Sequence, residues 1–155
     1  MVASPWLLKA SGTPQTPAEM ARFTLIEAGD AHRTANLEWL TWRRWFDTQG
    51  CGQLQPKRWL YFNYAHQIVQ AALAGQGLAL ARMPLIADAL ASGDLVEVMP
   101  GHRLDSPLAY WLLTGPRSSQ RPEIQAFCAW LALEAENTRR AIGDMPDPDT
   151  LASPY

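Results

Sequence analysis

The chain has 155 residues, a length that fits one domain or one compact pair of lobes. Hydrophobic residues make up 48% of the chain and charged residues 18%, which excludes a disordered polypeptide. The net charge of −2 excludes a protein that binds nucleic acid by charge over its whole surface.

The cysteine content and the hydropathy pattern indicate the cellular compartment in which the protein is located. Cys51 and Cys128 do not form a CxxC pair, which disfavours a disulfide scaffold or a zinc ribbon and fits a reducing compartment. We expect no signal peptide, and no segment approaches the roughly 20 apolar residues of a membrane helix. The sequence therefore predicts a cytoplasmic protein without membrane contact.

The first part of the chain predicts a short helix, a strand and a longer helix. The short helix covers residues 16–22, and Phe23–Ile26 forms a buried strand. The longer helix covers about Leu37–Gln49 and places four aromatic side chains in one arc of about 120°. These are Trp39, Trp42, Trp45 and Phe46. We interpret them as core or subunit-interface packing, and a cofactor box is the alternative.

The middle of the chain alternates strands and helices. The predicted elements are strand Trp59–Phe62, helix Tyr64–Ala74, strand Leu78–Met83, helix Pro84–Ala91 and strand Leu95–Val98. This order predicts an α/β sheet with crossover helices. Gly75 and Gly77 form a GxG that follows a helix and precedes a strand. A phosphate-binding loop needs the reverse order, so these glycines are predicted to end the helix.

The last part of the chain predicts one more strand and one more helix. Leu108–Thr114 is a continuous apolar run, typical of a strand that is buried on both faces. Pro122 opens the last helix, and the residues from Asp144 onward have the composition of a disordered tail.

Motifs of catalysis and metal binding are absent from the sequence. There is no GxSxG, no P-loop and no HExxH, and the three histidines lack the spacing of metal ligands. We therefore predict no catalytic residue, no metal and no cofactor. An α/β enzyme that uses Cys51 or His66 is the least favoured hypothesis, because the sequence shows no base or orienting carboxylate at a recognisable spacing from either residue.

Two loops at strand ends are the candidate binding positions, since ligands of open α/β sheets bind at the carboxyl ends of strands. The first loop follows Phe23–Ile26, and the second follows Trp59–Phe62 and opens a helix. The predicted ligand-binding residues are Glu27, Ala28, Asp30, Asn63, Tyr64 and His66. The free N–H groups at the helix start favour a carboxylate, and Glu27 and Asp30 favour an ammonium group, so we predict a small carboxylate, preferably an amino acid.

Several segments, in this order, resemble LysR-type transcriptional regulators. The segment 68–81, Ile-Val-Gln-Ala-Ala-Leu-Ala-Gly-Gln-Gly-Leu-Ala-Leu-Ala, resembles a hallmark of that family. Trp42–Phe46 followed by Gly50 is similar to the branch typified by the glycine cleavage activator. The other segments that carry the resemblance are 2–7, 16–20, 87–96, 108–113, 121–123, 127 and 130–131.

The resemblance implies an α/β, type 2 periplasmic-binding-protein-like fold in which the second lobe is nearly complete. Residues 4–101 would form effector-binding lobe II, and residues 102–143 the returning strand and C-terminal helix of lobe I. Residues 144–155 would be the disordered tail. The resemblance implies that most of lobe I and the winged helix-turn-helix are absent, so DNA would be bound only through a domain outside this chain.

The resemblance also implies a function, the small-molecule sensor region of a bacterial LysR-type regulator. A stand-alone solute-binding protein of the same fold is the alternative. The family's cleft positions coincide with the two strand-end loops chosen above. We further expect self-association, because the apolar strand Leu108–Thr114 would lack most of its neighbours and an unpaired apolar edge recruits another chain.

Overall fold

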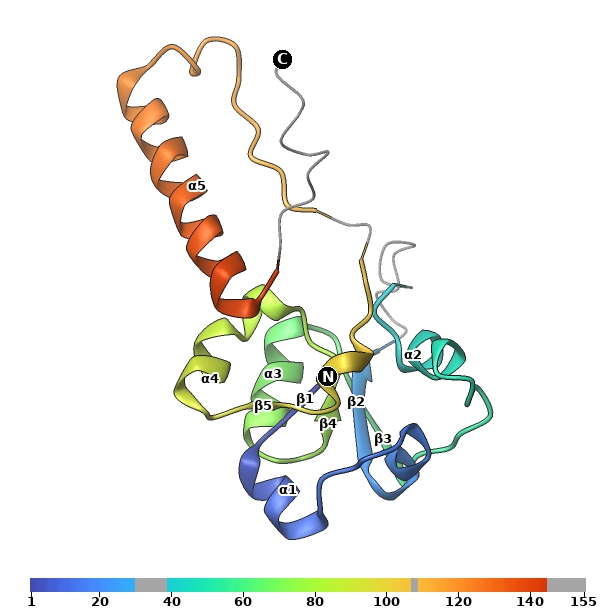
Figure 1. Cartoon of the computed structure of the whole chain (residues 1–155). Helices are drawn as coiled ribbons and strands as arrows, with labels where there is room; N and C mark the ends of the chain where they lie inside the picture. The colour runs from blue at the N-terminus through green and yellow to red at the C-terminus, as the bar shows by residue number, and fades with distance from the viewer. Residues whose placement is uncertain (30–38, 107–108, 145–155) are drawn as a thin grey trace. The chain divides into compact units, whose positions relative to one another are not determined.

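A computed structural model describes residues 1–29, 39–106 and 109–144 (Figure 1). The chain divides into two compact units, Met1–Leu108 and Ala109–Tyr155. The first unit holds a single five-stranded sheet, and the second holds one long helix.

The sheet of the first unit is mixed. Its strands, in spatial order, are β3 (Arg58–Phe62), β2 (Thr24–Ala28), β4 (Leu78–Ala79), β1 (Val2–Ala3) and β5 (Val96–Glu97). β2 runs parallel to β3 and β4, whereas β1 is antiparallel to β4 and β5. The parallel strands β2, β3 and β4 therefore end at the same edge of the sheet.

Helices surround this sheet. They are α1 (Pro5–Ser11), α2 (Trp42–Thr48), α3 (Ala65–Leu73) and α4 (Ala87–Ser92), with short 3-10 helices η1 (Pro17–Arg22), η4 (Met83–Leu85) and η5 (Pro100–His102). Successive residues of β2 belong to two separate core clusters. Leu25 is in the cluster of Trp42 and Trp45, and the next residue, Ile26, is in the cluster of Ile68 from α3. The sheet is thus covered on both faces, as the predicted α/β architecture requires.

The predicted helix Leu37–Gln49 was expected to bury four aromatic side chains, and the structure confirms this for three of them. Trp42, Trp45 and Phe46 are buried and pack on one another, with ring centroids 5.5–5.8 Å apart. The helix begins later than predicted, because Thr41 Oγ1 accepts a hydrogen bond from Arg44 N and caps it. Trp39 therefore precedes the helix; its ring is 37% exposed and lies 4.0 Å from the Arg44 guanidinium carbon.

Several predicted elements of the first unit are wrong in extent. β2 continues to Ala28, so Glu27 and Ala28, expected in a loop, are the last two residues of the strand. The predicted helix Pro84–Ala91 is divided into η4 and α4.

The family resemblance implies a crossing strand over Val2–Leu7, but the strand ends at Ala3, because Pro5 occupies the first turn of α1. Leu78–Met83, expected as one strand, ends at Ala79. The chain then turns into η4, where Pro84 lacks the N–H that a strand needs.

The glycine pair was interpreted correctly. Gly75 follows the last turn of α3 with a φ of 65°, a left-handed conformation that ends a helix. The ring of Trp6 packs against the position where a side chain of Gly75 would project. Gly77, by contrast, lies against the Thr24 carbonyl group of β2.

An ion pair fixes the segment after β5. Arg103 donates from Nε and Nη2 to the two carboxylate oxygens of Glu97, at 2.6 and 2.7 Å. The guanidinium lowers the pKa of Glu97, first through the hydrogen bond and then through its charge.

The predicted strand Leu108–Thr114 is wrong for the residues that are described. Residues 109–114 form no strand, and Trp111 and Leu113 are 79% and 87% exposed. No strand in the described part of the chain pairs with them, so their backbone N–H and C=O groups have no partner strand with which to form a β-ladder. The last helix, α5 (Pro122–Ile142), begins at the predicted residue. The predicted tail lies outside the described residues from position 145 onward.

Candidate functional site

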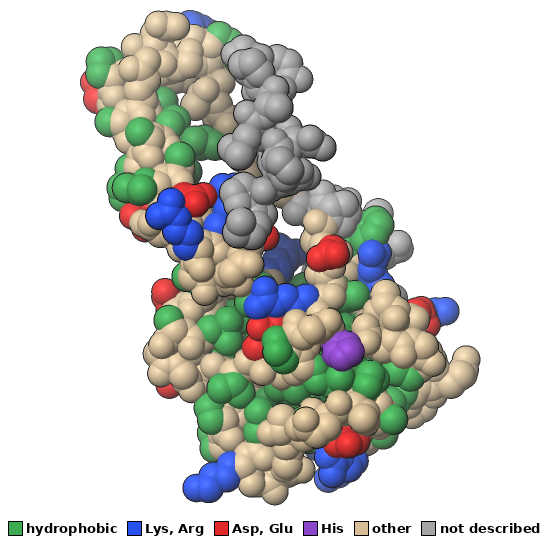
Figure 2. Space-filling model, in the orientation of Figure 1, with side chains coloured by type: hydrophobic (Ala, Val, Ile, Leu, Met, Phe, Trp, Pro, Cys, Tyr) green, Lys and Arg blue, Asp and Glu red, His purple; other side chains and the backbone are tan. Residues whose placement is uncertain are grey.

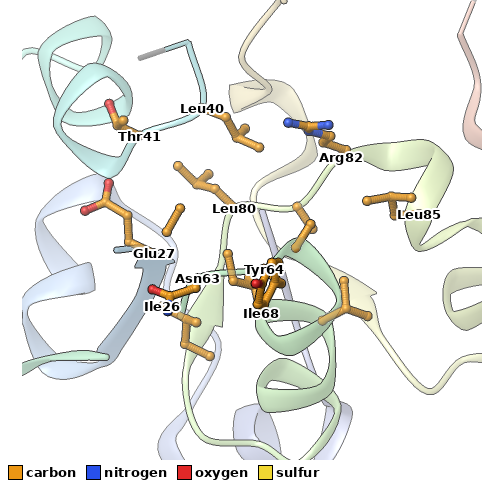
Figure 3. Close-up of a pocket in the computed structure, with 14 residues that line it drawn as sticks. Ile26, Glu27, Leu40, Thr41, Asn63, Tyr64, Ile68, Leu80, Arg82 and Leu85 are labelled. Atoms are coloured by element: carbon orange, nitrogen blue, oxygen red, sulfur yellow. The ribbon is translucent and has the colours of Figure 1, made fainter. Parts of the chain in front are cut away.

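A cavity of about 210 Å³ lies at the carboxyl ends of the three parallel strands (Figure 3). One wall comes from the end of β2, one from the start of α3 after β3, and one from the segment after β4. The lining residues are Ile26, Glu27, Ala28, Leu40, Thr41, Asn63, Tyr64, Ala65, Ile68, Val69, Leu80, Ala81, Arg82 and Leu85. The position is the one at which open α/β sheets bind ligands.

The β2 wall is joined to α2 through Glu27. The Glu27 side chain is buried, and its Oε1 accepts a hydrogen bond from Trp42 N at 2.8 Å. The Trp42 indole in turn donates from Nε1 to the Ile26 carbonyl at 2.9 Å. The carboxylate thus serves a first-turn amide of α2, where a negative charge is stabilised.

The β3 wall is the start of α3. The Tyr64 carbonyl accepts from Gln67 N and Ile68 N at 3.0 and 3.3 Å, so the amides of Ala65 and His66 are the ones with no acceptor inside the helix. Gln67 Oε1 accepts from Tyr64 N at 3.3 Å. The rings of Tyr64 and His66 stack, with centroids 5.7 Å apart, and both are exposed.

The β4 wall brings a cation to the cavity. Arg82 lies three residues beyond the end of β4, and its carbonyl accepts from Leu85 N at 3.0 Å in the turn that opens η4. Figure 3 shows Arg82 and Glu27 on opposite sides of the cavity, with Leu40 and Leu80 between them. The charged groups are separated by an apolar region.

Four of the six predicted binding residues line this cavity: Glu27, Ala28, Asn63 and Tyr64. His66 does not line it, and Asp30 lies outside the described residues. Sequence reasoning missed Arg82, because it placed this residue inside the strand Leu78–Met83 rather than beyond a strand end. The cue was Pro84, which marks where the strand must stop.

The residues considered for an enzyme offer little chemistry. Cys51 is a free, half-buried thiol that packs against the first core cluster. Burial raises the pKa of the Cys51 thiol and so opposes formation of the reactive thiolate. Within the described residues, no group of three His, Cys, Asp or Glu side chains could hold a metal ion. Likewise, no helix in that part of the chain is long and apolar enough to cross a membrane.

An open α/β sheet with a cavity at its strand ends is the architecture in which such sheets bind small molecules. Residues 1–135 match the model of the LysR substrate binding domain, so the chain belongs to this family. It is 28% identical over 134 residues to the glycine cleavage system transcriptional activator of Escherichia coli K12. It is also 30% identical over 130 residues to the HTH-type transcriptional regulator TrpI of Pseudomonas aeruginosa.

These alignments cover 86% and 84% of this chain but only 41% of each relative. The chain therefore spans about two fifths of the length of the curated relatives that it matches. These relatives are transcriptional regulators rather than enzymes or solute-binding proteins.

Solved structures support the same fold. The effector domain of the regulator AmpR of Pseudomonas aeruginosa superposes with a TM-score of 0.54 at 24% identity, over 89% of this chain and 62% of that one. The regulatory domain of CrgA, a LysR-type regulator of Neisseria meningitidis, gives a TM-score of 0.55 at 17% identity, over 86% of this chain and 62% of that one. Both confirm the predicted periplasmic-binding-protein-like fold.

Proposed function

We propose that the cavity at the strand ends binds the effector of a bacterial transcriptional regulator, and that the effector is a small carboxylate or an amino acid. The observation that carries this proposal is the cavity of about 210 Å³ at the carboxyl ends of β2, β3 and β4 in a LysR-type lobe. Glu27, Ala28, Asn63 and Tyr64 would contact the ligand directly.

The start of α3 supports the preference for a carboxylate. Its first amides have no acceptor within the helix and carry the positive end of the helix dipole. A carboxylate oxygen placed there would accept from the backbone amides of Ala65 and His66. In this arrangement His66 contributes its amide, because its ring is stacked on Tyr64 and does not line the cavity.

The DNA contact of such a regulator would come from a different domain, and the regulator would act in the bacterial cytoplasm. On the face drawn in Figure 2, the acidic and basic side chains that are described lie interspersed, without a continuous basic patch. The net charge of −2 points the same way. The described part of the chain thus supports a sensor role rather than a DNA-reading role.

The experiment is a titration of the isotope-labelled 155-residue chain with amino acids and organic acids, followed by backbone amide NMR shifts. We expect the largest shifts at the amides of Ala28 and of residues 63–66, and their dependence on ligand concentration gives the dissociation constant. Asn63→Ala should weaken binding by about 2- to 10-fold, the value of one neutral hydrogen bond.

His66→Ala is the matched control, since it keeps the amide and removes only the exposed ring. Its affinity should equal that of the unmodified chain. If no acid in the panel perturbs residues around the cavity, or if the shifts cluster elsewhere, the proposed function of this cavity is wrong.

We also propose that the chain self-associates through its second unit. Tyr110, Trp111 and Leu113 are exposed, and Phe127 and Trp130 of α5 are 52% and 53% exposed. Contiguous exposed apolar patches are typical of association surfaces, and we propose that these side chains form one. Sedimentation velocity at tens of micromolar should show oligomers, and Trp111→Asp with Leu113→Asp should shift them to monomer. A monodisperse monomer of the unmodified chain would contradict this proposal.

A further inference from the structure

Arg82 is the cationic side chain among the described residues that line the cavity. We propose that its guanidinium binds the same carboxylate of the effector that accepts from the first amides of α3, and that the effector is a small monoanion with an apolar body. This inference rests on the proposed function, in which the cavity is the effector site, and it adds the residue and the ligand chemistry that determine specificity.

The first step of the argument is that Arg82 has a fixed backbone and an uncommitted side chain. Its carbonyl is held by Leu85 N at 3.0 Å in the turn that opens η4. Its guanidinium makes no hydrogen bond or ion pair within the described residues, whereas Arg22, Arg103 and Arg140 are each paired with a glutamate. A planar guanidinium fits a carboxylate through two parallel hydrogen bonds.

The second step concerns charge. One guanidinium balances one negative charge, and the other charged group of the lining, Glu27, is an acid. In Figure 3 Glu27 lies on the opposite side of the cavity from Arg82. A ligand that placed a second carboxylate there would meet a buried acidic side chain of the same sign. The geometry therefore favours a monocarboxylate over a dicarboxylate or a phosphate ester.

The third step concerns the space between the two charged groups. Leu40 and Leu80 line this space in Figure 3, and Ile68, Val69 and Leu85 extend the apolar lining. Burial of a hydrocarbon group against apolar surface is favourable, whereas a polar group buried there finds no hydrogen-bond partner. A cavity of about 210 Å³ is also smaller than the roughly 300–1,000 Å³ of pockets for drug-sized ligands. The body of the ligand should thus be a short aliphatic chain.

The test uses 4-methylpentanoate as the probe, with its neutral amide, 4-methylpentanamide, as the matched compound. Both are titrated by NMR into the 155-residue chain and into three variants. Arg82→Ala should weaken the acid by about 10-fold or more, the value of a hydrogen bond to a charged group, and leave the amide unchanged. Arg82→Lys keeps the positive charge but lacks the planar guanidinium. Its affinity for the acid should lie between those of the unmodified chain and Arg82→Ala.

Arg43→Ala is the control for a general loss of positive charge. Arg43 is exposed on α2 and does not line the cavity, so its removal should change the affinity for the acid by less than about twofold at physiological salt. Equal affinities for acid and amide, or an unchanged affinity in Arg82→Ala, would overturn the role of Arg82 while leaving the cavity as the binding site.

Two further probes test the charge of the ligand. Succinate and isobutyl phosphate should each bind more weakly than 4-methylpentanoate, and tighter binding of either would overturn the monoanion inference. L-Leucine tests whether an ammonium group is tolerated beside the carboxylate, and tighter binding than the plain acid supports an amino acid of the same apolar class. The absence of any shift at the cavity with every probe would instead overturn the proposed function, and this inference with it.

Discussion

Replacing Trp42 by alanine is expected to lower the free energy of unfolding by about 3–5 kcal/mol, the usual cost of removing a buried aromatic ring. The Trp42 side chain is fully buried between Trp45 and Phe46, with ring centroids at 5.6 and 5.8 Å. The substitution also leaves the Ile26 carbonyl without the indole donor at 2.9 Å. Urea denaturation followed by circular dichroism measures the loss.

The loss expected for Trp42→Ala is a large fraction of the typical free energy of unfolding of about 5–15 kcal/mol, so this variant can fail to fold. A second, more conservative substitution at the same position is therefore measured as well. Trp42→Phe keeps the backbone hydrogen bond to Glu27 but removes the indole hydrogen bond to the Ile26 carbonyl and part of the buried ring, and should cost about 1–3 kcal/mol. Arg43→Ala on the same helix is the matched control: this side chain is exposed, so its loss should stay within about 0.5 kcal/mol. Equal losses in Trp42→Ala and Arg43→Ala would contradict the burial on which the core assignment rests.

Trp42 also shows which features the sequence predicts well. The helical spacing of Trp42, Trp45 and Phe46 was sufficient to assign them to the core, because an amphipathic helix buries its apolar stripe. The same spacing included Trp39, which lies outside the helix. Periodicity does not show where a helix starts; here the start is set by the Thr41 hydroxyl, whose capping bond spans only three residues.

The candidate site was predictable at two of its three walls. The apolar residues that lead to the ends of β2 and β3 are clear in the sequence. Glu27, the penultimate residue of β2, and Asn63, directly after β3, were therefore found. The third wall was not found, because the apolar run Leu78–Met83 continues beyond the point where β4 ends. Residues after Ala79 face a cavity rather than a neighbouring strand, and an apolar cavity lining has the same composition as a buried strand.

The segment Ala109–Thr114 shows why apolar composition does not by itself predict a strand. A strand forms only where another strand satisfies its backbone N–H and C=O groups, and no described strand does so here. The strand was predicted from its apolar run, and the family resemblance implied it as well. The family match confirms the resemblance, and the alignments span about two fifths of the relatives. Pairing depends on residues distant in sequence, so a local pattern does not reveal whether the partner strand is present.

Gly77→Ala is expected to destabilise the first unit by about 1–3 kcal/mol, the range for overpacking a filled site. A Cβ at this position would collide with the Thr24 carbonyl oxygen and lie 3.0 Å from its carbon. Both atoms belong to the backbone of β2, whose next residue, Leu25, pairs with Leu78, so the sheet itself must shift to make room. Gly101→Ala is the matched control, because no atom lies within 4 Å of its added Cβ, and its stability should stay within about 0.5 kcal/mol of the unmodified chain. Chemical denaturation of both variants measures the difference, and equal midpoints with equal denaturant dependence would show that β2 and the segment before β4 do not approach each other so closely.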